Sequence, residues 1–295
     1  MEGTGTYGAG LARHLAQHDV EVIEVDRPDR KTRRRQGKSD PVDAIAAARA
    51  VLAGTATGAP KTRTGPVEAI RALRVARRGA VKARTAALNQ LHGLLTSAPE
   101  PLRAALTGLR TTELVNRCAG FRIDPARLLE PAMATKAALR AIARRIQTLE
   151  EEIALADARL RPATATVAPQ TAALFGAGPD VAGQLLVTAG DNPHRLRSEA
   201  AFAMLCGAAP LPASSGRTHR HRLNRGGDRA ANAAIHRIVL CRMRHHQRTQ
   251  AYVDRRTAQG LSKKEIMRCL KRYVVREVHT ALMADFTAPR GLDSP

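Results

Sequence analysis

The chain has 295 residues and a formal net charge of +22. Its length favours two compact domains over one, and a 44% hydrophobic content supplies enough apolar material for a core, so the charge excess does not indicate general disorder. Arg or Lys interrupts every apolar stretch, which excludes a membrane-spanning helix, and no secretory signal is visible. We therefore expect a globular cytoplasmic protein with no membrane partner.

Nucleic acid is the partner that the charge predicts, because a basic surface releases counterions when it binds a polyanion. Nearly all of the excess lies after residue 60. Aromatic residues are 2% of the chain, which argues against membrane anchoring and against a stacking platform for single strands. The four cysteines lie far apart, and this spacing predicts buried reduced thiols without a zinc site or a disulfide framework.

The first segment reads as an α/β fragment. A helix is predicted over 8–18, a strand over 20–26, a basic loop over 27–38, and a second helix from Ser39 or Asp40 to Ala53. Pro41 fits the first turn of that helix.

The middle of the chain is predicted to be helical. A long basic helix covers 67–95, and another covers 136–160, where apolar residues recur at alternating intervals of three and four. That spacing suits a coiled coil and the core helix of a bundle equally well. Residues 162–170, rich in Ala, Thr and Pro, are expected to form a linker.

The last third is predicted to contain helices over 181–189, 199–206, 230–244 and 263–283, with a polar, flexible, basic stretch over 214–229. Residues 174–179 resemble a helix-hairpin-helix turn, whose backbone N–H groups can face a phosphate. A plain connector between helices is the commoner use of such a turn.

Two groups of residues could carry chemistry. Asp40 and Asp43 stand three apart at a helix start, which puts their Cβ atoms about 5–6 Å apart and suits Mg²⁺ or Mn²⁺, with Glu2 as a third oxygen ligand. A helix cap with a first-turn acid is the alternative, and spacing alone favours it. Ser214 and Ser215 lie among Arg and His residues that could hold a phosphate under attack, although Ser-Ser-Gly is most often a flexible loop. No G-x-S-x-G elbow is present, which excludes an α/β-hydrolase.

Three basic runs, 27–38, 217–229 and 242–256, favour Arg over Lys, and Arg grips phosphate with paired hydrogen bonds. A solvated face in an Arg-biased proteome is the alternative. The residues predicted to contact nucleic acid are Arg33, Arg34, Arg35, Lys38, Arg217, Arg220, Arg222, Arg225 and Arg229.

Motifs along nearly the whole chain resemble one family. They are Glu2-Gly-Thr-Gly-Thr-Tyr-Gly8, Lys38-Ser-Asp-Pro-Val-Asp-Ala44, and Gly207-Ala-Ala-Pro210 followed by Ser214-Ser-Gly216 and Asn224-Arg-Gly-Gly-Asp-Arg-Ala230. Together they resemble the insertion-sequence one-ten family of DEDD transposases, which is related to the Piv DNA invertase.

The resemblance implies an α/β plus mainly α architecture: an incomplete RNase H-like (RuvC-like) N-terminal domain, a coiled-coil middle and an α-helical C-terminal transposase domain. The implied boundaries are 1–98, 99–161 for the helical linker region, 171–260 for the serine transposase domain, and 261–295 for a C-terminal helix and tail.

The implied chemistry is DNA transposition. Glu2, Asp40 and Asp43 match three of the four metal-binding acids, and Ser215, in preference to Ser214, matches the serine that attacks a DNA phosphodiester with help from Mg²⁺. A homo-oligomer is expected, and some members of the family are guided by an RNA transcribed from the element's own ends.

One departure from the family pattern is that its first acid lies upstream of the Glu-Gly-Thr-Gly motif, where this sequence has only Met1. We therefore expect a truncated N-terminal domain that is unstable or differently packed, and little recombination by this chain. The alternatives are a catalytically dead nucleic-acid-binding remnant, a metal-dependent nuclease without serine chemistry, and a helical scaffold, which would not explain the Arg217–Arg229 run.

Overall fold

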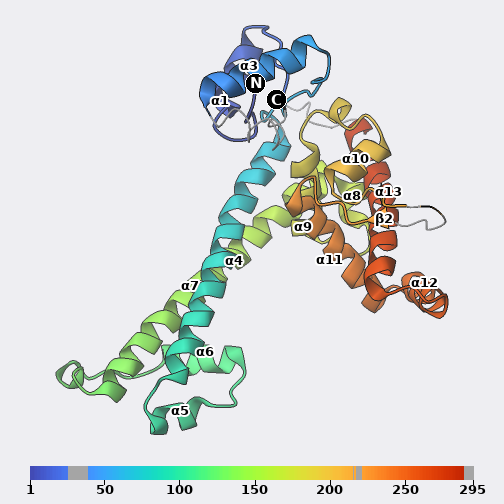
Figure 1. The fold of residues 1–295 in the computed structure, drawn as a ribbon. Helices are drawn as coiled ribbons and strands as arrows, with labels where there is room; N and C mark the ends of the chain where they lie inside the picture. Colours follow the sequence, from blue (N-terminus) through green and yellow to red (C-terminus); the bar gives the residue numbers. More distant parts are fainter. Residues whose placement is uncertain (26–38, 215, 217–220, 289–295) are drawn as a thin grey trace. The chain divides into compact units, whose positions relative to one another are not determined.

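The computed structural model describes residues 1–25, 39–214, 216 and 221–288 (Figure 1). The chain divides into two compact units, one built from residues 1–71 and 164–295 and the other from residues 72–163. The described residues are mostly helical with few strands, which confirms the predicted α-rich character. The RNase H-like fold and the domain boundaries given above stay predictions.

Among the described residues of the first part of the chain are the helices α1 (Ala9–Gln17) and α3 (Asp40–Leu52), both as predicted. Ser39 is the N-cap of α3, and Pro41 lies in its first turn. The predicted strand over 20–26 is wrong for its described residues, which make only one β-bridge, between Glu24 and Gly58. A strand needs a ladder of hydrogen bonds along its length, and here only isolated bonds, such as Val25 N–H to Met1 O at 2.8 Å, are present.

The unit of residues 72–163 is helical. It contains most of α4 (Pro66–Thr96) and α7 (Pro131–Val167), with the short helices α5 (Glu100–Leu106), α6 (Thr111–Ala119) and η1 (Pro125–Arg127) between them. Both long helices were predicted; α5, α6 and η1 were not, because segments of three to nine residues show too little periodicity.

The apolar residues that recur along α7 at intervals of three and four are buried inside this unit. Leu139 and Ile146 belong to one cluster with Leu91 of α4, Leu106 of α5 and Leu114 of α6. An ion pair between Arg77 and Asp157, 2.5 Å from Nε to Oδ1, also joins α4 to α7. This packing is that of a bundle core, and a coiled coil with a second chain stays a prediction.

The linker predicted over 162–170 is wrong. Helix α7 continues through Pro162 to Val167, and α8 (Pro169–Ala173) follows at once. Pro162 removes one backbone hydrogen bond, but Leu160, Thr164 and Ala168 around it are completely buried, and this burial offsets the loss.

In the C-terminal part, α8, α10 (Glu199–Leu205), α11 (Arg229–His245) and α12 (Gln247–Ala258) pack against α13 (Lys263–Thr287) (Figure 1). Helix α9 (Pro179–Ala189) packs against α11, and the turn η2 (Pro193–Arg195) precedes α10. Leu185 of α9, Ile238 of α11 and Val278 of α13 are fully buried. Helices α9, α10, α11 and α13 were predicted. Helix α12 was not, because its sequence is dominated by polar and basic residues.

The four cysteines differ in how deeply they are buried. Cys118 and Cys206 are buried, and burial raises their pKa values to about 11 and about 12. Cys241 and Cys269 are only half-buried, so the prediction of four buried thiols is wrong for these two.

In the described part of the chain, no helix combines the length and apolarity needed to cross a membrane.

Candidate nucleic-acid interface

A short antiparallel hairpin precedes α11. Strands β1 (Leu211–Pro212) and β2 (His221–Arg222) pair with Leu211 opposite Arg222 and Pro212 opposite His221. The sequence predicted only a flexible stretch here. Ser214 lies exposed in the connection between the strands, whereas Ser215, Arg217 and Arg220 lie outside the described residues.

The base of the hairpin is held by close backbone contacts at two glycines. Gly227 has φ +80°, and a Cβ atom there would lie 2.5 Å from Leu205 O and 2.8 Å from Gly207 N. Gly207 has φ +60°, and its Cβ would lie 2.7 Å from Gly226 O. Only glycine fits such positions, so the Gly-Ala-Ala-Pro and Asn-Arg-Gly-Gly-Asp motifs lie backbone to backbone.

Side chains of α9 and of the first turns of α11 fix the same base. Asp228 caps α11 by accepting hydrogen bonds from Ala230 N (2.7 Å) and Ala231 N (3.2 Å), and Thr188 of α9 donates to its other oxygen at 2.8 Å. One turn later, Asn232 donates from Nδ2 to Cys206 O at 2.8 Å. The sequence reading missed Asp228 and Asn232 as positioning residues, although an Asp directly before a helical run is an N-cap signal.

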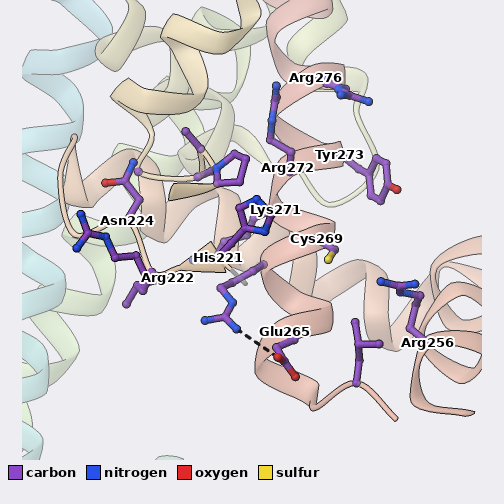
Figure 2. A pocket seen from close by; sticks show the side chains of 17 residues that line it. His221, Arg222, Asn224, Arg256, Glu265, Cys269, Lys271, Arg272, Tyr273 and Arg276 are labelled. Atoms are coloured by element: carbon purple, nitrogen blue, oxygen red, sulfur yellow. Dashed lines mark ion pairs between the residues drawn. The ribbon is translucent and has the colours of Figure 1, made fainter. Parts of the chain in front are cut away.

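A pocket of about 720 Å³ opens between this hairpin base and helices α12 and α13 (Figure 2). Its wall contains one acid, Glu265. The cationic side chains that line it are Arg222, Arg256, Arg268, Lys271, Arg272 and Arg276. The excess of cations gives this surface a positive charge that favours anionic ligands.

Ion pairs neutralise only part of this charge. Arg268 lies 3.9 Å from Glu265, the ion pair drawn in Figure 2. Arg272 and Arg276 both pair with Glu199 of α10, the latter at 3.6 Å. One carboxylate therefore serves two guanidinium groups.

Burial disfavours the charged forms of several of these side chains. It lowers the pKa of Lys271, and burial followed by repulsion from Arg276 lowers the pKa of Arg272. Burial and then the charge of Lys271 also lower the pKa of His236 on α11. A phosphate in the pocket would relieve this repulsion.

The sequence did not predict most of these cations as nucleic-acid contacts. Of the predicted residues, Arg222, Arg225 and Arg229 are described and exposed, and only Arg222 lines the pocket. Arg33, Arg34, Arg35 and Lys38 lie outside the described residues. The missed signal was the four-residue spacing of Arg268, Arg272 and Arg276, which puts them on one face of a helix.

The predicted metal ligands are placed apart from this pocket. Asp40 and Asp43 lie in the first turn of α3, exposed and half-buried respectively, and Glu2 lies in the segment before α1. Across the described ranges, no three Asp, Glu, His or Cys side chains form a group that could hold a metal ion. The carboxylate chemistry suits Mg²⁺, but the described geometry does not assemble a three-ligand site.

The turn that resembles a helix-hairpin-helix motif lies against α11. Gly176, with φ +85°, approaches so closely that a Cβ atom would lie 3.3 Å from Cβ of Cys241 and 3.4 Å from Ile238 O. Close packing against α11 therefore explains why residue 176 is a glycine, whereas a Cβ atom at Gly178 would meet no atom within 4 Å. Phosphate binding by this turn stays a prediction.

Comparison with known proteins gives matches to both parts of the chain. A DEDD transposase model of the IS110 type, described as Transposase, matches residues 1–99, and a model described as Transposase IS116/IS110/IS902 family matches residues 170–254. No curated protein matches the chain. The two matches cover more than half of the residues, and the second includes the hairpin, α11 and most of α12. The chain belongs to the IS110 family of transposases, which act on DNA.

Proposed function

We propose that the chain cuts and rejoins the DNA of an insertion sequence with Ser215 as nucleophile, and that the cationic pocket holds the DNA backbone beside it. The observation that supports this most directly is the path of the hairpin: the connection after β1 carries the serines, and β2 returns to contribute His221 and Arg222 to the pocket wall. On this proposal, a phosphate bound there is the one that Ser215 attacks.

The proposed step is a transesterification. Ser215 Oγ attacks the phosphorus of a phosphodiester; an Oγ–P bond forms, one P–O bond to deoxyribose breaks, and the proton lost by the serine is balanced by the proton that the leaving oxygen takes up. The number of phosphodiester linkages is conserved, so a second DNA end can reverse the step without an energy source. The guanidinium groups stabilise the charge that builds up on the phosphoryl oxygens.

Glu2, Asp40 and Asp43 remain the proposed ligands for Mg²⁺ or Mn²⁺. A divalent ion there would supply charge neutralisation at a reacting phosphate. Of these three acids, only Asp40 and Asp43 share a helical turn in the described structure. The large basic surface also suits a guide RNA, and recombination between ends suits a homo-oligomer.

The test is the capture of a covalent DNA adduct. Because little complete recombination is expected from this chain, the test follows the serine step alone. We expect the full chain, incubated with labelled duplex carrying the element's ends, to give an adduct that survives denaturation, with the phosphopeptide mapping to Ser215. Ser215→Ala abolishes this adduct, and the matched variant Ser214→Ala retains it.

Other outcomes identify the alternatives. An adduct that survives Ser215→Ala but not Ser214→Ala contradicts the choice of nucleophile. Cleavage that persists without any adduct indicates a metal-dependent nuclease. Binding without cleavage in every variant indicates a nucleic-acid-binding remnant.

A further inference from the structure

Two of the three tyrosines of this chain lie in contact beside the cationic pocket. Tyr252 of α12 and Tyr273 of α13 have ring centroids 5.6 Å apart and planes at 83°, an edge-to-face pair. The guanidinium carbon of Arg255 lies 5.4 Å from the Tyr252 centroid. The chain has no Trp, so this pair is a concentration of scarce aromatic residues at one place.

Tyr273 faces the pocket. Its side chain lines the pocket together with the cations, yet 47% of the residue is exposed to solvent. A second cavity of about 270 Å³, lined by Tyr252, Arg248 and His246 among others, also reaches Tyr273. In Figure 2, Tyr273 and Arg256 lie on one side of α13, with His221 and Arg222 on the other. The pocket thus has an aromatic end and a hairpin end.

Tyr252 holds the Tyr273 ring in place. Tyr252 is half-buried, and burial, followed by the neighbouring Cys269 and Tyr273, raises its pKa to about 12, so its phenol stays neutral near pH 7. An edge-to-face contact favours one orientation of the two rings, and the 47% exposure of Tyr273 leaves part of this residue accessible to a ligand. Tyr252 is therefore a positioning residue, and Tyr273 is the ring that a ligand can reach.

An anionic group joined to a flat aromatic group matches such a pocket. Each nucleotide of a nucleic acid has this form, but in a duplex the faces of the bases are covered by their neighbours. An unpaired nucleotide exposes its base, and stacking on an aromatic side chain is worth ~1–3 kcal/mol per base. The pocket volume of about 720 Å³ is within the range of small-ligand sites.

We propose that the pocket binds an unpaired nucleotide, with its phosphate among the guanidinium groups of α12 and α13 and its base stacked on Tyr273. This inference rests on the proposed role of the pocket in nucleic-acid binding and adds the form of nucleic acid that enters it. The low aromatic content had predicted no stacking platform. Composition counts aromatic residues but not where they lie, and one accessible ring beside six cations suffices for one base.

The first experiment compares affinities of the full chain carrying Ser215→Ala, so that no covalent step interferes. The probes are a 12-nucleotide single-stranded DNA, an RNA of the same sequence, and a fully paired hairpin duplex of equal phosphate number. Tyr273→Ala is expected to weaken binding to an unpaired strand about 5- to 150-fold, the equivalent of ~1–3 kcal/mol. Binding to the duplex should change less than twofold.

Two variants control for the ring and for a general loss of tyrosine. Tyr273→Phe keeps the ring and should keep the affinity. Tyr7→Ala removes a fully exposed tyrosine that does not line the pocket and should change nothing. The DNA and RNA arms show which unpaired strand the pocket prefers, and a loss in either arm supports the inference.

Fluorescence gives an independent readout. In the variant Tyr7→Phe, Tyr252→Phe, Tyr273 is the sole tyrosine in a chain without Trp, so its emission reports on this site alone. We expect single strands to quench it strongly and the paired hairpin to quench it weakly at equal saturation.

The inference is overturned by equal losses for single strands and duplex in Tyr273→Ala, by no loss at all, or by equal quenching. Its failure is separable from failure of the serine chemistry. If the adduct forms at Ser215 but Tyr273→Ala has no selective effect, only this inference fails. If no adduct forms but the selective effect is seen, only the serine assignment fails.

Discussion

Lys271 of α13 donates a hydrogen bond of 2.8 Å from Nζ to Oδ1 of Asn232 on α11. Asn232 in turn donates from Nδ2 to Cys206 O at 2.8 Å and to Gly207 O at 3.1 Å. The Asn232 amide therefore links Lys271, which lines the cationic pocket, to the backbone at the base of the hairpin.

Asn232→Ala should reduce stability by on the order of 2–4 kcal/mol, because three hydrogen bonds are lost and Lys271 is left half-buried without this acceptor. Urea denaturation followed by circular dichroism measures the loss. The matched control is Asn116→Ala, where an exposed amide in the other unit loses one bond to Gln147, and here we expect a change within about 0.5 kcal/mol. Equal effects of the two substitutions would contradict the role given to Asn232.

Comparing Gly227→Ala with Gly260→Ala separates the cost of a positive φ from the cost of a steric clash. The two glycines have nearly the same φ, +80° and +81°, but a Cβ at Gly260 meets nothing within 4 Å, whereas at Gly227 it would clash with three backbone atoms. Gly260→Ala should cost about 1–2 kcal/mol from conformation alone. Gly227→Ala should cost more than about 3 kcal/mol or prevent folding, as measured by the same denaturation. A difference below about 1 kcal/mol would mean that the hairpin base tolerates movement.

His236 should make stability depend on pH. Burial and Lys271 hold its pKa in the folded protein below the usual 6.5, and its buried Nδ1 has no hydrogen-bond partner in the described part of the chain. The unfolded chain therefore binds the proton more readily than the folded chain. The contribution of neutral His236 to the free energy of unfolding is fully present above about pH 6.5 and is lost as the pH falls below that value.

The measurement is the free energy of unfolding at several pH values between 7.5 and 5.5. His236→Gln should flatten the decline relative to the unsubstituted chain, while His245→Gln, an exposed residue on the same helix, should leave it unchanged. A decline of the same slope in all three proteins would show that other groups control it.

Salt dependence should report the phosphate contacts in the pocket. Arg222→Gln and Arg268→Gln should each lower the slope of log K against log salt for DNA binding by about 1, since each removes one phosphate contact. Arg237→Gln is the matched control, because Arg237 lies outside the pocket and is already paired with Asp180 at 2.8 Å. We expect its slope to stay unchanged, and a reduction of the same size there would show that the effect is one of net charge alone.

The sequence by itself determined the family, the α-rich character and most of the long helices. Helices α4 and α13 follow from apolar periodicity, and the start of α3 follows from Ser39 and Pro41. These signals are local, since each depends on residues within one or two turns. The family motifs are local for the same reason, and the matched models confirmed them.

Only the tertiary structure decided where the cations and aromatic rings meet. The pocket joins Arg222 of β2 to Arg276, more than fifty residues later, and no periodicity links the hairpin to α13. Long-range packing also decided against two local predictions. Helix α7 continues through Pro162, where the sequence predicted a linker, and the segment predicted as a strand has no neighbouring strand to pair with in the described residues. Long-range contacts set these outcomes, because burial and strand pairing gain their free energy from residues distant in the sequence.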